Sequence, residues 1–136
     1  MEDNRARLEQ AIADWNRGAL DAYLTIYDPS VQLHGYSPEP MNLEQVKGFY
    51  GMIAAAFPGS IIELLDVITE GDRVVARFAQ TGQHDGDFMG VPPSGNPIVL
   101  NGITILKFAG GRVIERHSSA DMLGLMVQIG AIPPPS

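Results

Sequence analysis

Three histidines, His34, His84 and His117, are the side chains best suited to move a proton near neutral pH. Imidazole titrates near pH ~6.5 without help, whereas a carboxylate reaches that range only when burial raises its pKa. The chain has no cysteine, and its histidines are too far apart to resemble the closely spaced ligands of a zinc site. We therefore predict a site without metal or cofactor, at which one histidine acts as the base.

Each candidate for acid or base chemistry also has a structural alternative. A histidine at the end of a strand, as His34 is predicted to be, can simply be hydrogen-bonded at the surface. His84 stands between two glycines, a setting that suits a hydrogen bond fixing a loop, and His117 can equally serve in packing. Asp121 stands where a helix needs its N-cap, a role that contributes about 1 kcal/mol to stability. The sequence leaves these alternatives open.

Aromatic and thioether side chains could form the wall of a pocket for a flat ligand. Aromatic residues at helical spacing belong more often to a core than to a ligand site. Trp15 and Tyr50 each keep a polar group that can donate a hydrogen bond to a ligand oxygen. The full set comprises Trp15, Tyr23, Tyr27, Phe49, Tyr50, Phe88 and Met89.

The apolar residues recur first with a helical period and then with a strand period. Helices are predicted over 4–17, from 20 to 27 and from 43 to 57, the third opened by a capping box of Asn42 and Gln45. Strands are predicted at 31–34, 61–69, 73–83, 98–108 and 112–119, and a last short helix follows Asp121. The segment 84–97, rich in glycine and proline, is predicted to be a loop that covers a pocket.

The order of these elements favours a single α+β domain spanning residues 1–136. Helices come first and a four-stranded meander follows, which is not the alternation expected of βαβ units. With 45% apolar and 18% charged residues, the chain has the composition of an ordinary globular domain. A bent sheet covered on one side by helices leaves a hollow at its open end, where a small molecule can bind.

Composition and charge argue against several classes of partner. Sixteen acidic against nine basic residues give a net charge of −7, which offers no basic patch for nucleic acid. The longest apolar run, residues 52–57, is far shorter than the ~20 residues that cross a membrane. The first residues lack the pattern of a signal peptide and the chain lacks cysteine, so we predict a soluble, cytoplasmic protein.

Several motifs together resemble one known family. They are GQHDGDFMGVPPSG at 82–95, GITILKF at 102–108, GRVIE at 111–115 and DMLGL at 121–125. The N-terminal half is similar in Trp15, in YDP at 27–29 and in LHG at 33–35. Over most of its length the chain resembles the SnoaL-like polyketide cyclase and ester cyclase family, within the nuclear-transport-factor-two-like superfamily.

This resemblance implies a cone-shaped, curved antiparallel sheet packed on the N-terminal helices, a cystatin-like roll. It implies a pocket lined by the first helix, the end of the first strand and the inner sheet face, and a homodimer formed through the outer sheet face. His34 ends the strand where related isomerases place their catalytic carboxylate, so the resemblance makes it the first candidate for the base. Asp121 or His117 would assist it.

The chain departs from the family pattern at two positions that matter for chemistry. The last strand reads Glu115-Arg116-His117-Ser118 where many members resemble Glu-His-Trp-Asp, and Thr104 stands where an aspartate is common. The acid or base carboxylate of the family is therefore missing at these positions. We expect substrate contacts from a set that combines the motif and the aromatic residues: Trp15, Tyr27, Tyr50, His84, Phe88, Met89, Thr104 and Ser118.

Two functions of different class follow. The first is a cofactor-independent enzyme, a cyclase, isomerase or lyase acting on a small hydrophobic carbonyl compound. The second is a non-catalytic domain whose hollow holds a small apolar ligand or whose surface serves dimerisation. An enzyme is expected to have a solvent-connected pocket above ~300 Å³ with at least two titratable groups pointing into it.

Overall fold

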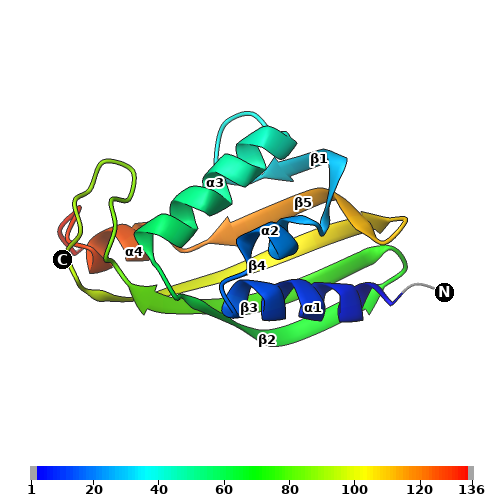
Figure 1. Cartoon of the computed structure of the whole chain (residues 1–136), viewed down its shortest axis with the longest axis horizontal. Coiled ribbons are helices and arrows are strands. Elements are labelled where there is room, and N and C mark those ends of the chain that lie inside the picture. Colours follow the sequence, from blue (N-terminus) through cyan, green and yellow to red (C-terminus); the bar gives the residue numbers. More distant parts are fainter. Residues whose placement is uncertain (1–2, 135–136) are drawn as a thin grey trace.

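The structure, a computed structural model, describes residues 3–134 (Figure 1). Its helices and strands agree with the sequence-based boundaries to within a few residues, except at the first strand and the second helix. In chain order the elements are α1 (Asn4–Asn16), α2 (Leu20–Leu24), β1 (Tyr27–His34), α3 (Leu43–Ala56), β2 (Ile61–Glu70), β3 (Arg73–Gln83), β4 (Pro97–Ala109), β5 (Arg112–Ala120) and α4 (Met122–Gln128).

The five strands form one sheet in the order β1-β5-β4-β3-β2. Strands β2 to β5 form the predicted antiparallel meander, and β1 joins its edge parallel to β5. Residues Tyr27-Asp28-Pro29, which lie before the predicted strand at 31–34, already belong to β1, because Tyr27 pairs with Val113. The register shifts between Tyr27 and Gln32, so Pro29, which has no N–H to donate, lies in an irregular part of the ladder.

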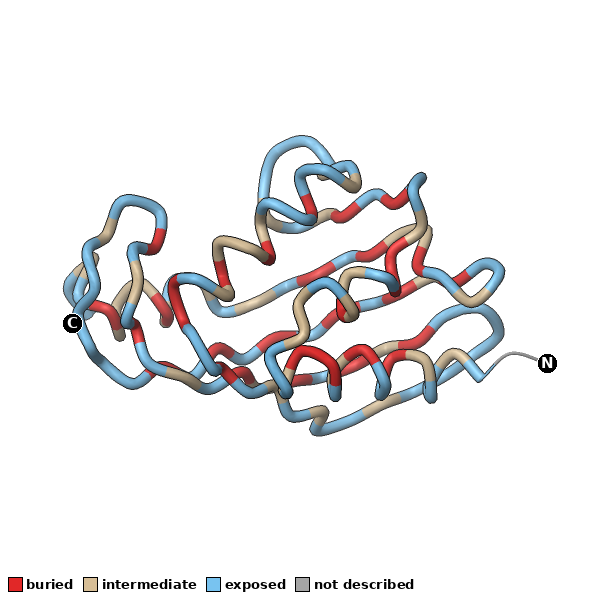
Figure 2. Tube along the Cα trace, viewed as in Figure 1, coloured by how far each residue is buried: buried red, intermediate tan, exposed pale blue. Residues whose placement is uncertain are grey.

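Helices α1, α2 and α3 cover one face of the sheet, and the core lies between the two layers (Figure 1). Along β3 and β4 the burial alternates residue by residue, as expected for strands with one covered face (Figure 2). The inward residues include Val74, Ala76, Leu100 and Leu106, all at most 7% exposed. The opposite face of the sheet is not covered by any helix of the described chain.

Local sequence signals fix the ends of two helices. Asn42 and Gln45 form the predicted capping box at the start of α3, each side chain binding the other's backbone N–H. Asp121 is the N-cap of α4, and its carboxylate accepts a hydrogen bond from the N–H of Gly124. No helix among residues 3–134 is long and apolar enough to cross a membrane.

The glycine-rich loop between β3 and β4 is held against the end of α3. The backbone N–H groups of Asp85 and Gly86 both donate to the carbonyl of Ala56. A Cβ at Gly86 would collide with the backbone of Ala55, so this close approach requires a glycine. His84 then anchors the far side of the loop, since its N–H donates to Asn96 and its carbonyl accepts from Gly95.

Candidate functional site

A cavity of about 50 Å³ lies between the helices and the inner face of the sheet. Its wall is mostly apolar, and its polar side chains are four tyrosines, one arginine, one threonine and one glutamine. The lining residues are Leu8, Ile12, Tyr23, Ile26, Tyr27, Tyr36, Phe49, Tyr50, Ile53, Ile62, Leu64, Ala76, Phe78, Gln80, Leu100, Thr104, Leu106, Arg116 and Met122.

Arg116 is the one charged side chain in this lining. It points inward because burial alternates along the second half of β5, and the residue is 9% exposed. Its Nε donates to the hydroxyls of Thr104 and Ser118 at 2.8 and 3.1 Å, and these two hydroxyls bind each other. The guanidinium is thereby fixed from the sheet side.

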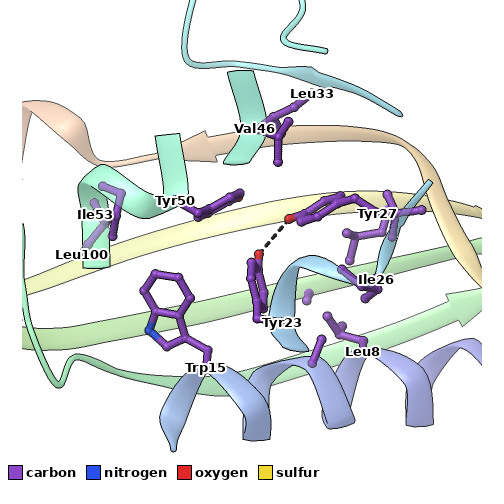
Figure 3. Close-up of a cluster of buried hydrophobic side chains, with 14 of the residues drawn as sticks. Leu8, Trp15, Tyr23, Ile26, Tyr27, Leu33, Val46, Tyr50, Ile53 and Leu100 are labelled. Carbon is purple, nitrogen blue, oxygen red and sulfur yellow. Dashed lines mark hydrogen bonds between the residues drawn. The ribbon is translucent and has the colours of Figure 1, made fainter. Parts of the chain in front are cut away.

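Three phenol hydroxyls hold the other end of the guanidinium. Nη1 of Arg116 donates to Tyr27 at 2.6 Å and Tyr50 at 2.7 Å, and lies 3.2 Å from the hydroxyl of Tyr23. The hydroxyls of Tyr23 and Tyr27 are hydrogen-bonded at 2.7 Å (Figure 3). The three rings pack against each other with centroids 5.3 to 6.0 Å apart, and Trp15 packs edge-on against two of them. We call Arg116 with Tyr23, Tyr27 and Tyr50 the arginine–tyrosine cluster.

Burial controls the charges in this cluster. Desolvation raises the pKa values of Tyr23, Tyr27 and Tyr50 above the usual value, against the opposing effect of the nearby guanidinium, so all three phenols stay protonated. Burial opposes the charge of Arg116, but the phenols around it favour the charge, and its pKa stays above the usual value. Among the described residues Arg116 forms no ion pair with a carboxylate. The cluster therefore carries one positive charge.

The hydrogen-bonding capacity of the cluster is not used up. None of the hydrogen bonds within the described chain involves Nη2 of Arg116, so its two N–H groups are available to a ligand. Of the three phenol protons, one is used between Tyr23 and Tyr27. Chemically, such donors suit an oxygen that carries negative charge or gains it during a reaction.

A second polar group lines the cavity further along β3. Gln80 is 7% exposed, and its Nε2 donates to Ser60, which also accepts from the indole N–H of Trp15. The Gln80 carbonyl oxygen has no hydrogen bond within the described residues. It is therefore an acceptor available to a ligand.

Comparison with known proteins identifies the family. Residues 6–129 match the SnoaL-like polyketide cyclases. The chain belongs to the SnoaL-like polyketide cyclase family. A search of the curated proteins found no match.

Solved structures of this kind are similar over almost the whole chain. AclR from Streptomyces galilaeus, a candidate hydroxylase, is 29% identical with a TM-score of 0.86, over 98% of this chain and 84% of AclR. A candidate SnoaL-like polyketide cyclase from Jannaschia sp. CCS1 is 30% identical with a TM-score of 0.84, over 96% and 93% of the two chains. TsrD from Streptomyces laurentii is 26% identical with a TM-score of 0.81, over 96% and 100%. The predicted nuclear-transport-factor-two-like α+β fold is confirmed.

Four of the residues predicted to contact substrate lie at the cavity of this SnoaL-like chain. The cavity lining includes Tyr27, Tyr50 and Thr104. The hydroxyl of Ser118 accepts a hydrogen bond from Nε of Arg116. The two positions at which the family pattern has carboxylates are thus occupied by hydroxyls that bind the same guanidinium. Because hydroxyls replace carboxylates at these two positions, the positive charge of Arg116 in the cavity is not neutralised there.

The prediction that His34 reaches the cavity is wrong. Leu33 and Arg116 are paired and face inward, so their neighbours His34 and His117 face the outer side of the sheet. There the two imidazole rings stack with centroids 4.2 Å apart, and Nε2 of His34 lies 3.0 Å from a carboxylate oxygen of Glu115. Neither histidine lines the cavity.

The remaining predicted site residues also lie outside the cavity lining. Asp121 is exposed and caps α4. His84, expected to contact substrate, is fully buried outside the lining, and its Nδ1 accepts from the N–H of Ser94, so it holds the loop. Phe88 is fully buried in the core, and Met89 is 65% exposed. Trp15 packs behind the tyrosines and donates to Ser60.

The residues that dominate the site, Arg116 and Gln80, were not predicted from the sequence. Arg116 was noted only as part of a departure from the family pattern, and Gln80 was not considered. No local sequence pattern indicated the inward position of Arg116, because Val113 and Arg116 are both buried although they lie three residues apart, and the pairing of β4 with β5 shifts register between Lys107 and Phe108. Burial of an arginine in a strand of a small domain marks a functional candidate, since charged residues are almost never fully buried without a partner.

Within residues 3–134, one group of side chains could hold a metal ion: His34, Glu115 and His117, whose ligand atoms lie within 4.8 Å of one another. This group is on the outer face, separate from the arginine–tyrosine cluster. The inner cavity, with a guanidinium and protonated phenols, offers no metal ligands of the usual kind.

Proposed function

We propose that this SnoaL-like chain is a cyclase- or isomerase-like enzyme that acts on a small hydrophobic carbonyl compound without a cofactor. The observation that carries the proposal is the buried Arg116, whose Nη2 is unused and whose charge has no carboxylate partner in the described chain. In the proposed reaction the carbonyl oxygen of the substrate accepts hydrogen bonds from the arginine–tyrosine cluster.

The cluster would accelerate the step in which negative charge develops on that oxygen. Removing a proton from the carbon next to a carbonyl gives an enolate, and aldol closure of a ring gives an alkoxide. Fixed donors in an apolar cavity stabilise either oxyanion more strongly than the neutral ground state. Loss of one such donor typically lowers kcat by about 10²–10³-fold.

The proton acceptor in this proposal is not a side chain of the cavity. The lining within the described residues contains no aspartate, glutamate or histidine, and its phenols stay protonated. The reaction is therefore limited to carbon acids that can lose a proton to water or to another group of the substrate. A carbon between two carbonyl groups, as in a poly-β-keto chain, is acidic enough for this route.

The size of the cavity sets a further condition. Its volume of about 50 Å³ is well below the ~300 Å³ typical of pockets for drug-sized ligands. Tyr36, Phe49 and Met122 line the cavity and are only partly buried, so they are the side chains whose rotation would widen it. The proposal requires this widening when a ligand of ring size enters.

The proposal is tested with Arg116→Met and the matched control Arg77→Met. Arg77 lies on the exposed side of β3, where it pairs with Asp66, so its replacement removes a surface charge of the same kind. Hydrophobic 1,3-dicarbonyl compounds are offered to both variants and the wild type, and enolisation is followed by exchange of the α-proton with D₂O. We expect Arg116→Met to lower kcat/KM by at least 100-fold and Arg77→Met to leave it unchanged. Equal rates in all three proteins would overturn the proposal.

The alternative is a non-catalytic domain that binds a small molecule. The small cavity and the lack of a base in its described lining favour this alternative. It predicts that ligands bind, that binding depends on Arg116, and that no α-proton exchange exceeds the uncatalysed rate. A substrate panel that binds without exchange would therefore select the alternative.

We also propose that the outer face of the sheet binds a second copy of the chain. On β4 the outward residues Val99, Ile103 and Ile105 are 40–50% exposed, which leaves an apolar strip on an uncovered face. A homodimer would bury this strip. Sedimentation of wild type and Ile103→Lys tests the proposal, with a shift from dimer to monomer expected in the variant. A wild type that sediments as a monomer at micromolar concentration would contradict it.

A further inference from the structure

The positive charge of Arg116 is buried without a matching negative charge. The guanidinium is hydrogen-bonded only to hydroxyls within the described chain, at Tyr23, Tyr27, Tyr50, Thr104 and Ser118. We propose that the cavity takes an organic anion, a largely apolar molecule whose negative charge lies on oxygen and pairs with Nη2 of Arg116. This inference deepens the proposed function by naming the charge of its ligand, and it rests on the same cavity.

The hydroxyl groups around Arg116 satisfy hydrogen bonds of its guanidinium but do not neutralise its positive charge. Hydroxyls accept hydrogen bonds, so Nε and Nη1 are satisfied. Transfer of an ion into an apolar site remains costly until a counter-charge is present. The side chains hydrogen-bonded to Nε of Arg116 are those of Thr104 and Ser118, and both are neutral hydroxyls that supply no counter-charge. An anionic ligand is therefore the group that completes the site.

The position of Gln80 adds a second requirement on the ligand. Gln80 and Ala76 lie four residues apart on β3, about 13 Å at the usual rise, and Ala76 is paired with Thr104 beside the guanidinium. Apolar side chains line the space between, among them Leu100 and Phe78. The free carbonyl of Gln80 accepts a hydrogen bond. A ligand that uses both ends has an anionic oxygen at one end, an apolar middle and a hydroxyl or amide donor at the other.

The experiment compares carboxylates with neutral molecules of the same shape. Hexanoate and benzoate are titrated into the protein by calorimetry, with hexanamide and benzamide as neutral controls. Ser118→Asp places a carboxylate next to Nε of Arg116 while leaving the arginine in place. Arg116→Met serves as a second variant in case Ser118→Asp fails to fold, which circular dichroism reveals.

We expect the wild type and the control Arg77→Met, whose arginine lies on the exposed side of β3, to bind each carboxylate at least tenfold more tightly than its amide. Ser118→Asp or Arg116→Met should remove this preference. The inference is overturned if amides bind as tightly as carboxylates, if neither carboxylate binds at 10 mM, or if the preference persists in Arg116→Met. Anion binding without any α-proton exchange would refute only the proposed enzyme, whereas exchange without anion preference would refute only this inference.

A separate observation on the outer face carries a second proposal. The strand pairing of β1 with β5 places His34 beside His117, with ring planes only 2° from parallel, and Glu115 hydrogen-bonds His34. We infer that His34, Glu115 and His117 form a binding site for a divalent transition-metal ion of the zinc class. Two imidazoles and one carboxylate are the ligand set of many zinc sites that keep an open position.

Small side-chain movements are enough to form this site. Ligand atoms of a tetrahedral zinc ion at ~2.0–2.2 Å lie about 3.3 Å apart. The atoms offered by the three residues lie within 4.8 Å of one another, and Nε2 of His34 is already 3.0 Å from the carboxylate of Glu115. The side chains of His34 and Glu115 are 31% and 37% exposed, so they are free to rotate and an ion can reach them. Lys107, opposite Glu115 on β4, is the described cation nearest in register and opposes binding.

Zinc titration of the wild type tests this site, with Mg²⁺ as the control ion. We expect one zinc ion per chain with a micromolar Kd and at least a tenfold loss of affinity in both His117→Ala and Glu115→Gln. Ser119→Ala, an exposed neighbour on the same face that offers no ligand, is the matched control variant. Unchanged affinity in His117→Ala, no zinc bound at 1 mM, or one ion per two chains would each overturn the site.

Discussion

The two faces of β5 carry different chemistry within four consecutive residues. On the inner face, Arg116 and Ser118 are at most 9% exposed and belong to a cluster with a positive charge and protonated phenols. On the outer face, Glu115 and His117 lie near His34, partly open to solvent, where a carboxylate and two imidazoles meet. The inner group is suited to hold an oxyanion, and the outer group is suited to hold a metal ion.

The difference shows that the face of the strand to which a side chain points decides which of the two clusters it joins. Successive side chains of a strand point to opposite faces, so a shift of one position exchanges the two clusters. A histidine beside an arginine in the sequence is therefore no evidence that both serve one site. At this end of the strands the facing is fixed by Leu33, which is buried and pairs with Arg116. Experiments that act on one face should leave the other unaffected.

The largest contrast between the faces is expected at alkaline pH. Burial raises the pKa values of Tyr23, Tyr27 and Tyr50 above 10.0, whereas in the unfolded chain they titrate near 10. Below pH 10 the phenols are protonated in both states. Above pH 10 only the unfolded state releases these protons, so the free energy of unfolding should fall by about 4 kcal/mol per pH unit for the three phenols. Urea unfolding between pH 8 and 12 measures this slope.

Tyr50→Phe provides the control for the alkaline prediction. It removes one of the three phenols while keeping the ring, so the slope above pH 10 should fall by about one third. Absorbance of the phenolate near 295 nm should rise together with unfolding rather than before it. Phenolates that form in the native protein at pH 10 would show that the inner cluster is open to solvent.

The next largest effect is expected on the free energy of unfolding when an inward residue of β1, Leu33, is replaced. Leu33 is 1% exposed and its neighbour Gln32 faces outward. Leu33→Ala should reduce the free energy of unfolding by about 2–5 kcal/mol because it leaves a cavity in the core. Gln32→Ala should change it by less than about 0.5 kcal/mol. Chemical denaturation of both variants checks the contrast, and similar losses would mean that β1 is not held by its inner face.

The fold could be predicted because its signals are local. The period of the apolar residues, the capping pair Asn42 and Gln45 and the glycine turns each depend on a few neighbouring residues, and all appear in the structure. The start of β1 at Tyr27 was missed because Asp28-Pro29-Ser30 has the composition of a turn. Its extended form depends on pairing with β5, more than eighty residues away, which no local pattern indicates.

The site could be predicted only in part because it depends on contacts across the sheet. The tyrosines were identified by type, but nothing in the sequence shows that Tyr23, Tyr27 and Tyr50 meet at one guanidinium. The choice of His34 rested on its titration range and on the resemblance, and both ignore the direction of the side chain. The approach of His34 to Glu115 and His117 likewise follows only from the parallel pairing of β1 with β5.

A smaller effect on the free energy of unfolding is expected from Thr104, whose hydroxyl connects Arg116 to β4. Thr104→Val keeps the shape of the side chain but removes the hydroxyl that accepts from Nε of Arg116 and binds Ser118. The free energy of unfolding should fall by about 1–3 kcal/mol, since a buried charged donor loses one acceptor. Ser119→Ala on the outer face should change it by less than about 0.5 kcal/mol. Equal effects on the two faces in thermal unfolding would contradict the role of Thr104.

The smallest effect is expected for the outer pair of His34 and Glu115. Both side chains are about one third exposed, so solvent screens their interaction, and pairs of this kind contribute about 0–1 kcal/mol. A double-mutant cycle with His34→Ala and Glu115→Gln should give a coupling energy below about 1 kcal/mol in metal-free buffer. The structure also predicts that His34→Ala retains α-proton exchange, because the imidazole lies on the side of the sheet away from Arg116. Loss of exchange in this variant would restore His34 as the base and require β1 to present its other face to the cavity.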